Sequence, residues 1–284
     1  MSALIYDFLL TTLSLVAWLF LLTAIFVPLE LLFSVRRQSV LRPNMLPDVG
    51  YFFLGGLIKA FFVAVVIGIV ASTARQFIPR SYFDLVGNLP ILVQILLAFF
   101  AGEIGFYWGH RAVHAYPALW QFHAVHHEPR RMDWLINTRM HPIDLVVTRM
   151  FGLMLVAILG LGAPGDNTSP LVPQIVLVFG TVWAFFIHAN IRWPMGWLEH
   201  MFSTPRFHHW HHSRDDHPDH NFASLLPLFD RIFGTLYMPR GEWPPSYGIA
   251  GESAPDDQQA KKPDLSRVEN VELMGDRSFD QHVI

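Results

Sequence analysis

Long apolar runs restrict this chain to a small set of folds. A helix needs about 20 mainly apolar residues to cross the hydrocarbon core of a membrane. Five stretches meet or approach that length: residues 8–27, 52–71, 89–109, 145–161 and 171–189. Apolar residues make up 52% of the chain and charged residues only 15%, against about 25% charged in ordinary soluble domains. We therefore predict an all-α integral membrane protein, a bundle of four to five transmembrane helices.

The ends of these stretches carry further signals. No basic residue precedes the first stretch, which is longer than the apolar part of a typical signal peptide, so we expect it to be retained as a span. Lys59 lies near the start of the second, where its long side chain can extend to the membrane interface. Gly, Pro, Asn and Ser in the segment 161–170 predict a turn that makes the last two stretches a hairpin.

Arginine positions predict the orientation in the membrane. The arginines next to the predicted spans are Arg36, Arg37 and Arg42 after the first stretch, and Arg111, Arg130, Arg131 and Arg139 after the third. The 161–170 turn has no Lys or Arg. Because cytoplasmic loops carry the excess of Lys and Arg, we expect the histidine-rich segments and the C-terminus on the cytoplasmic side, and the N-terminus outside. Arg75 and Arg80 would lie outside and run against this scheme.

Charge and cysteine content exclude several classes of function. A net charge of -3 and the lack of a Lys/Arg-rich block give no basic field for nucleic acid, so we expect no nucleic-acid partner. The chain has no cysteine, which excludes thiolate zinc sites and cysteine-bound iron–sulfur clusters. Any metal must therefore be bound by nitrogen and oxygen donors, and the 15 histidines are the candidates.

The histidines are clustered at helical spacings. The clusters are His110-x-x-x-His114, His123-x-x-His126-His127 and His208-x-x-His211-His212. Residues at i, i+3 and i+4 share one helix face, so we expect each cluster to present its imidazoles as a single group. Pro117 fits the first turn of a helix that ends before Pro129, and Thr204-Pro205 predicts a capped helix start before the third cluster.

A single histidine, His188, lies at the end of the fifth stretch, where an ionisable residue usually faces the bundle interior. Taken alone, each cluster could serve metal binding, proton exchange or packing. Two H-x-x-H-H clusters with one H-x-x-x-H are hard to explain as packing, and we predict metal binding. One metal needs three or four imidazoles, whereas nine suit two ions.

Other polar residues near the clusters are candidates to hydrogen-bond and orient metal-bound imidazoles. These are His141, Asn190 and Asn221, with Asp144 and Glu103 as further possibilities. Whether His141 or His209 is itself a ligand stays open. We expect His200, His217, His220 and His282 to be solvated or structural.

Imidazole suits zinc, copper and iron alike, so the ligand type does not choose the metal. The metallopeptidase signature H-E-x-x-H is absent, because His127-Glu128 is followed by Pro129 and Arg130. A transporter needs polar groups at mid-membrane, and the predicted spans are almost bare of them. The polar residues able to bind metal, the histidine clusters, lie instead beyond one end of the spans.

The order of the clusters resembles that of the fatty acid hydroxylase/sterol desaturase superfamily, the membrane-bound histidine-box diiron oxygenases. The resemblance covers residues 95–240 and includes "HRAVHAYPALWQFHAVHHEPRRMDWLINTRMHPID", "FIHANIR", "TPRFHHWHHS" and "NFASLLPLFDRIFGTLY". Superfamily members often have N-Y-G after the last box. Here "HNFASL" keeps Asn221 but has neither Tyr nor Gly in those places.

The resemblance implies a helical bundle with a cytoplasmic helical cap in which histidines hold two irons. Zinc can replace the iron in a purified sample. The implied ligands are His110, His114, His123, His126, His127, His188, His208, His211 and His212. The implied reaction uses O₂ and two electrons to hydroxylate or desaturate a C–H bond of a lipid or sterol-like substrate, and we favour hydroxylation. The electrons would come from a separate donor: cytochrome b5, ferredoxin or a similar reductase system.

We divide the chain accordingly into N-terminal transmembrane helices at 1–90, a fatty acid hydroxylase-like catalytic domain at 91–240 and a polar tail at 241–284. Two alternatives remain at this point. One is a histidine-rich membrane protein that binds or transports metal without redox chemistry. The other is a structural membrane protein whose histidines sense pH.

Overall fold

The computed structural model describes residues 3–162, 169–214 and 219–250, and the described residues up to 250 belong to one compact unit. These residues form helices and loops with no strand, only two isolated β-bridges, so the all-α prediction is confirmed. Parts of the predicted 161–170 turn and of the 241–284 tail, together with His217 and His282, lie outside the described residues.

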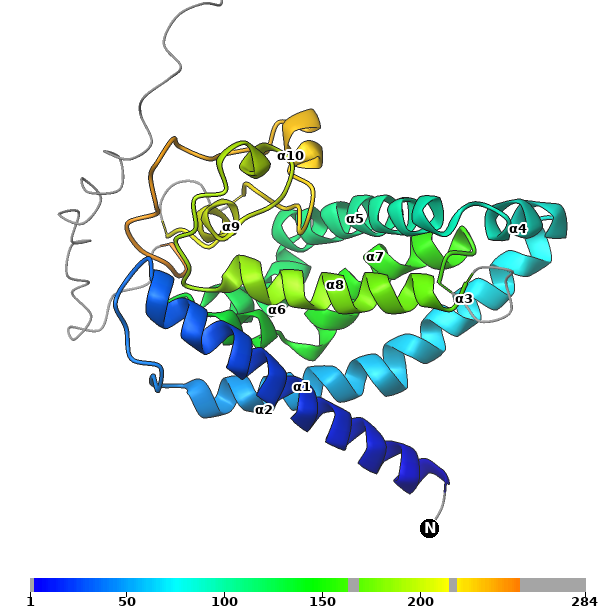
Figure 1. Cartoon of the computed structure of the whole chain (residues 1–284), viewed down its shortest axis with the longest axis horizontal. Coiled ribbons are helices and arrows are strands. Elements are labelled where there is room, and N and C mark those ends of the chain that lie inside the picture. Colours follow the sequence, from blue (N-terminus) through cyan, green and yellow to red (C-terminus); the bar gives the residue numbers. More distant parts are fainter. Residues whose placement is uncertain (1–2, 163–168, 215–218, 251–284) are drawn as a thin grey trace, which may run out of the picture. The chain divides into compact units, whose positions relative to one another are not determined.

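Thirteen helical elements follow one another along the described chain (Figure 1). In order they are α1 (Ala3–Phe33), α2 (Met45–Ile58), the π-helical turn η1 (Lys59–Val63), α3 (Ala64–Phe77), α4 (Arg80–Gly87), α5 (Ile91–Ala115), α6 (Pro117–His127), the 3₁₀ turn η2 (Trp134–Thr138), α7 (Pro142–Ile158), α8 (Leu171–His188), the 3₁₀ turn η3 (Gly196–His200), α9 (Pro205–His211) and α10 (Leu228–Ile232).

Four helical stretches are long and apolar enough to cross a membrane: α1, the continuous stretch Met45–Phe77, α5 and α8. Each matches a predicted span. The remaining predicted span forms α7, whose 17 residues are about 26 Å long at 1.5 Å per residue and fall short of a full crossing. The chain is thus an integral membrane protein with four candidate spans. The side of the membrane that the histidines face stays a prediction.

Local sequence signals determine where the histidine-bearing helices α6 and α9 begin. Tyr116 is extended and the following Pro117 opens α6, which ends at His127, two residues before Pro129. The Thr204 side chain accepts a hydrogen bond from the Phe207 amide at 3.3 Å, and Pro205 occupies the first turn of α9. Both helix starts agree with the sequence prediction.

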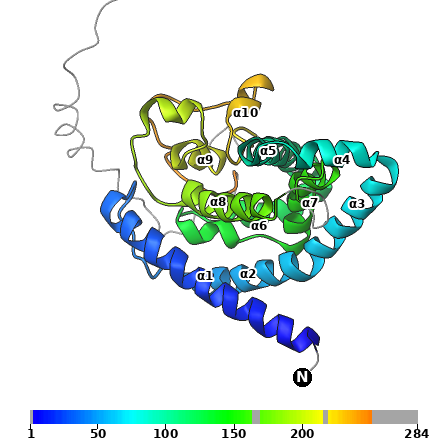
Figure 2. The same ribbon diagram turned by 45° about the vertical axis from the view of Figure 1, so that its right-hand side comes forward.

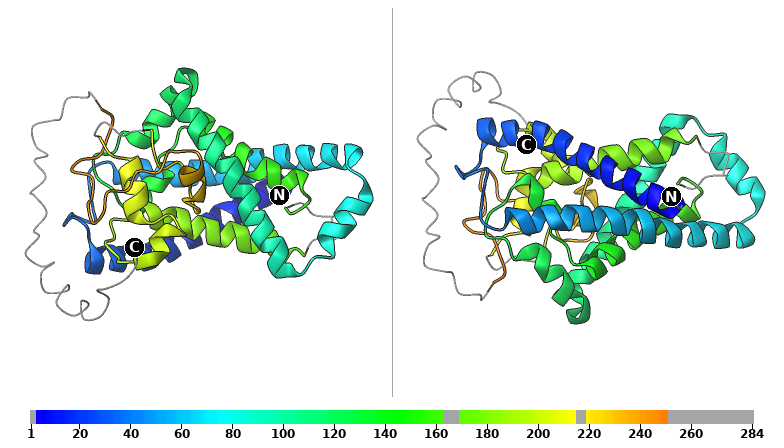
Figure 3. Two further views of the ribbon diagram at one scale, coloured as in Figure 1. Left: turned by 90° about the horizontal axis from the view of Figure 1, so that it is seen from above. Right: turned by 90° about the horizontal axis from the view of Figure 1, so that it is seen from below.

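Two apolar clusters hold these histidine-bearing helices together. On one side of α5 and α8, Tyr107 packs with Phe207, Phe222 and Phe229, which joins α5 to α9 and α10. On the other side, Phe26 and Phe185 pack around Trp134, which joins α1, α8 and η2. Figures 1 and 2 show α9 and α10 on one side of α5 and α8 and α1 and α2 on the other, and Figure 3 shows α1 and α2 from below.

The helix α5 packs most closely against α7, through glycines. A Cβ atom at Gly105 would overlap the backbone carbonyl of Phe151, and one at Gly109 would overlap the Phe151 side chain. Because the obstacle at Gly105 is backbone, it cannot rotate away. The α5–α7 distance therefore depends on glycine, and α5 carries His110 and His114.

We expect Gly105→Ala to lower the free energy of unfolding by about 1–3 kcal/mol, the usual cost of overpacking. Thermal unfolding of the purified protein in detergent measures this. Gly68→Ala in α3 is the matched control, because a Cβ atom there meets nothing within 4 Å. Equal unfolding temperatures for the two variants would show that the α5–α7 approach is not tight.

Candidate metal centre

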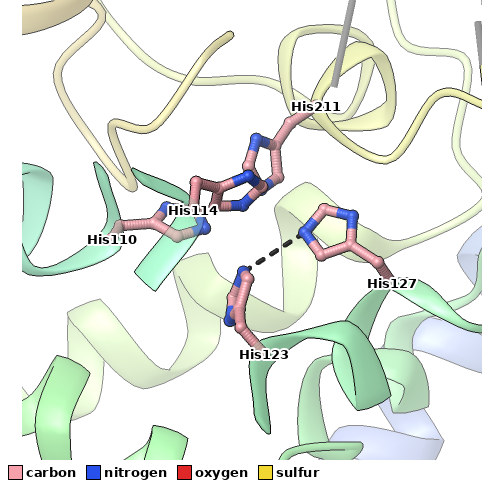
Figure 4. Close-up of side chains that lie close together, drawn as sticks. All are labelled: His110, His114, His123, His127 and His211. Carbon is pink, nitrogen blue, oxygen red and sulfur yellow. Dashed lines mark hydrogen bonds between the residues drawn. The ribbon is translucent and has the colours of Figure 1, made fainter. Parts of the chain in front are cut away.

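The nine histidines predicted as ligands come together in space and divide into two groups. The first group contains His110, His114, His123, His127 and His211, and the second contains His126, His188, His208 and His212. Within each group, one ring nitrogen per residue lies within 4.8 Å of those of the others. Figure 4 shows the first group, whose imidazoles come from α5, α6 and α9.

Each H-x-x-H-H cluster is shared between the two groups, which corrects the expectation that a cluster would act as a unit. In α6, His123 and His127 belong to the first group and His126 to the second; in α9, His211 points to the first and His208 to the second. Positions i+3 and i+4 lie on opposite sides of position i around a helix. One cluster can therefore serve two neighbouring centres.

Several of the imidazoles are held neutral by their surroundings. Eight of the nine residues are buried, and the side chain of the ninth, His114, is only 1% exposed. In the part of the site outside the spans, burial is the main cause that lowers the pKa of the imidazole, and repulsion between neighbouring imidazoles adds to it. The residues so affected are His126, His127, His208, His211 and His212. A neutral imidazole is the form that binds metal.

Backbone carbonyls fix the tautomer of several rings. The Nδ1–H groups of four histidines donate to carbonyl oxygens: His110 to Phe222 at 2.7 Å, His211 to His220 at 2.7 Å, His126 to Arg139 at 3.1 Å and His188 to Ala184 at 2.7 Å. A carbonyl can only accept, so the proton is on Nδ1 and the lone pair is on Nε2. That leaves Nε2 as the metal-binding atom in these four rings.

The Nε2 atoms of His126 and His188 lie 3.1 Å apart. Both rings carry their proton on Nδ1, so neither Nε2 has a hydrogen to share and two lone pairs face each other. In the first group, the buried Nε2 atoms of His114 and His211 have no hydrogen-bond partner among the described residues. A cation between such nitrogens removes the repulsion and supplies the missing partner, so the residues fit a metal at each group.

Asn221 acts on the site through the backbone. Its φ angle is +58°, and its side-chain amide donates to the carbonyls of Phe207 at 2.9 Å and Tyr237 at 2.6 Å. The next amide, of Phe222, donates to the Asp230 carboxylate at 2.8 Å. These bonds hold the carbonyls of residues 220 and 222 that accept from His211 and His110. Asn221 thus touches no metal-facing imidazole but places the acceptors of two of them.

Asp144 contacts a candidate ligand directly. Its carboxylate accepts from Nδ1 of His123 at 3.0 Å and is buried. A carboxylate in this position orients the imidazole and makes its other nitrogen a stronger ligand. Asp144 is one of the residues that the sequence suggests could orient an imidazole. The exposed Asp219, 3.2 Å from Nδ1 of His114, was missed, because nothing in its neighbourhood in the sequence marks it.

We expect Asp144→Asn to weaken metal binding by the first group about 10- to 100-fold, because the amide keeps the shape but loses the charge. Competition with a coloured chelator measures the affinity. The second group serves as an internal reference, and Asp219→Asn as a matched control whose effect is smaller because water screens it. Unchanged affinity in Asp144→Asn would remove Asp144 from the site.

The other polar residues that the sequence suggested as orienting partners form their hydrogen bonds away from the metal-facing imidazoles. The His141 ring accepts from the Ile143 amide at 3.1 Å and caps α7. Asn190 exchanges hydrogen bonds with the backbone of Arg36. The expectation that these two residues orient metal-bound imidazoles is therefore not met by their contacts. Glu103 accepts from Ser224, Leu225 and Leu226 rather than from a histidine.

His209 is close to the second group but outside it. Its ring lies 2.8 Å from the Tyr247 hydroxyl and 3.1 Å from the Ala189 carbonyl, and burial lowers its pKa to about 3. It ties α9 to the end of α8. His200 is exposed, and His220 contributes its carbonyl to His211.

Comparison with known proteins identifies relatives. Residues 95–235 match the family model for fatty acid hydroxylase. Ornithine lipid hydroxylase OlsE of Rhizobium tropici is 34% identical over 170 residues, which cover 58% of this chain and 48% of that protein. Human (Homo sapiens) alkylglycerol monooxygenase is 30% identical over 140 residues, 49% of this chain and 29% of that protein. Methylsterol monooxygenase 2-2 of Arabidopsis thaliana is 29% identical over 157 residues, 55% of this chain and 57% of that protein.

Residues 95–235, which match the family model, contain all three histidine clusters. The chain spans less than half the length of the first two of these curated relatives. No solved structure matches the chain.

Proposed function

Because residues 95–235 belong to the fatty acid hydroxylase family, we propose that this chain is a membrane-bound non-haem diiron oxygenase that hydroxylates a C–H bond of a lipid. The observation that carries the proposal is the pair of imidazole groups at the ends of membrane-spanning helices, with facing nitrogens that have no proton to share. Relatives named as hydroxylases and monooxygenases of ornithine lipid, alkylglycerol and methylsterol support a lipid or sterol-like substrate.

In this proposal each group of imidazoles holds one iron, five residues for the first and four for the second. The irons would supply the activation of O₂ with two electrons. The overall reaction is R–H + O₂ + 2e⁻ + 2H⁺ → R–OH + H₂O. Histidine nitrogens alone also accept zinc, so a purified sample can carry zinc in place of iron.

The protein's own residues have three tasks in this scheme. The carbonyls of residues 139, 184, 220 and 222 hold four of the rings with Nε2 toward the metal. Burial keeps the imidazoles neutral and excludes water from the site. The ligands of α5 and α8 lie at the ends of apolar helices, so a lipid can approach from the membrane without entering water.

The remaining assignments are part of the same proposal. In this proposal the electrons come from a separate donor such as cytochrome b5, ferredoxin or a similar reductase system. The histidine site and the C-terminus face the cytoplasm, as the arginine distribution indicates. The catalytic domain covers 91–240, with transmembrane helices before it and a polar tail after it.

Lipid profiling under ¹⁸O₂ tests the function. Membranes with the wild-type chain, an electron donor and ¹⁸O₂ are expected to yield lipids that have gained one ¹⁸O atom, and membranes with His123→Ala are not. Loss of two hydrogens without label would identify a desaturase. Metal flux into vesicles with no oxygen uptake would favour the alternative of a metal transporter and overturn the proposal.

A further inference from the structure

Two cationic side chains lie on packed helical elements outside the histidine site, at membrane depth. Lys59 lies in the π-helical turn η1, near the middle of the span Met45–Phe77, so the expectation that it lies near the start of its span is wrong. Arg149 lies in the middle of α7, which packs against η1 and α3. One helical turn earlier on each element, Gly55 lies against Leu145, so the two cations share the same seam between the helices. Figure 2 shows α3 and α7 side by side.

Neither cation has an anionic partner of its own. Among the described residues, no hydrogen bond or ion pair reaches Lys59 or Arg149, and Nε of Arg149 is buried without a partner. The two charges repel each other. Asp144 attracts Arg149 from a distance but makes no ion pair with it; Oδ2 of Asp144 is bonded to His123, and its buried Oδ1 has no hydrogen-bond partner.

An unpaired charge in the hydrocarbon region is costly, and ionisable residues there are normally paired or line a polar path. Two neighbouring cations with no carboxylate in ion-pair or hydrogen-bond contact among the described residues therefore indicate that an anion from outside the chain completes the site. Lys59 is exposed on the surface of the bundle, so such an anion can reach it from the membrane. A π-helical turn, the local structure at Lys59, often marks a functional position.

The same seam continues into an open apolar groove. Between α3 and the end of α7 lies a space of about 350 Å³, lined almost entirely by apolar side chains that include Ile69, Val70, Phe77 and Ile158. The two cations can bind an acidic head group, and the apolar groove farther along the seam can hold a hydrocarbon tail. Together they fit a molecule that has both parts.

We propose that Lys59 and Arg149 bind the acidic group, phosphate or carboxylate, of a lipid whose acyl chain lies along the α3–α7 seam. This site is separate from the metal centre and does not depend on the proposed reaction.

Native mass spectrometry of the full chain tests the site. The chain is purified in neutral detergent and incubated with dioleoylphosphatidylglycerol, dioleoylphosphatidylcholine or oleate. We expect at least about tenfold greater retention of one acidic lipid than of the net-neutral phosphatidylcholine. Phosphatidylglycerol would identify the acidic group as a phosphate and oleate would identify it as a carboxylate. Equal retention of all three lipids would overturn the proposal.

Variants locate the binding. Lys59→Gln and Arg149→Gln are expected to reduce retention of the acidic lipid to the phosphatidylcholine level, and Lys59→Arg to keep it. Arg37→Gln, an exposed cation in the loop after α1, is the matched control and should change nothing. Lys59 is exposed, so its replacement leaves folding intact, which unchanged metal content would verify. Full retention in Lys59→Gln would overturn the site, and the readout needs no hydroxylase activity.

Discussion

Alanine at His208 is expected to abolish lipid hydroxylation and to remove one of two metal ions per chain. Nε2 of His208 lies 2.9 Å from Nε2 of His188 and 3.2 Å from Nε2 of His212, at the centre of the second group. Its loss leaves three imidazoles for that ion. Partners that merely orient a ligand change metal affinity about 10- to 100-fold, so loss of a ligand is expected to cost at least about 100-fold.

Metal analysis and ¹⁸O₂ labelling of the same preparation measure the two effects together. The first group should keep its ion, because its five imidazoles are untouched. His200→Ala is the matched control: the residue has the same chemistry but is exposed and outside both groups. A His208→Ala protein with two ions and full activity would exclude the second group from the site.

Mild acid is expected to release the metal and to unfold the part of the protein that contains the histidine-bearing helices α6 and α9. The pKa values of His126, His127, His208, His211 and His212 are lowered from 6.5 by burial, with a further contribution from neighbouring imidazoles. Below pH 6.5 these imidazoles bind protons in the unfolded chain but not in the folded chain. Stability is therefore full above about pH 6.5 and falls as the pH drops below it.

The size of the acid effect follows from the number of groups. One pH unit below 6.5, each imidazole that stays neutral in the folded protein costs about 1.4 kcal/mol. Five together cost more than about 5 kcal/mol, which is comparable with the whole stability of many proteins. Protons also compete directly with the metal for the same nitrogens. Circular dichroism and metal release between pH 8 and pH 5 measure the loss, and a protein that keeps its metal and fold at pH 5 would contradict the neutral, metal-binding state of these residues.

The parts of this structure that depend on local pattern were predictable from the sequence. Apolar runs located all four candidate spans, and Pro117 and Thr204-Pro205 located the starts of two histidine-bearing helices. All nine converging histidines were identified, because their spacing places them on helix faces and His188 ends an apolar span. The α7 helix was expected as a possible span, since its composition is apolar and only its length of 17 residues distinguishes it.

Contacts between distant segments were not predictable. His126 belongs to a different group from His123 and His127 because of where α8 and α9 lie relative to α6. No local sequence pattern predicts that arrangement. The carbonyls that hold the rings, such as that of Phe222, carry no sequence signal, because every residue has one. His141 and Asn190 were reasonable candidates by position, yet each bonds to a nearby backbone segment instead.

The most direct test of this account is the iron content of the wild-type chain, purified from cells grown in iron-replete medium. Two groups of imidazoles with nitrogens facing one another predict two metal ions per chain, and one ion in a chain that lacks His208. A wild-type protein that carries less than one metal ion per chain would contradict the diiron centre and the oxygenase function proposed for it.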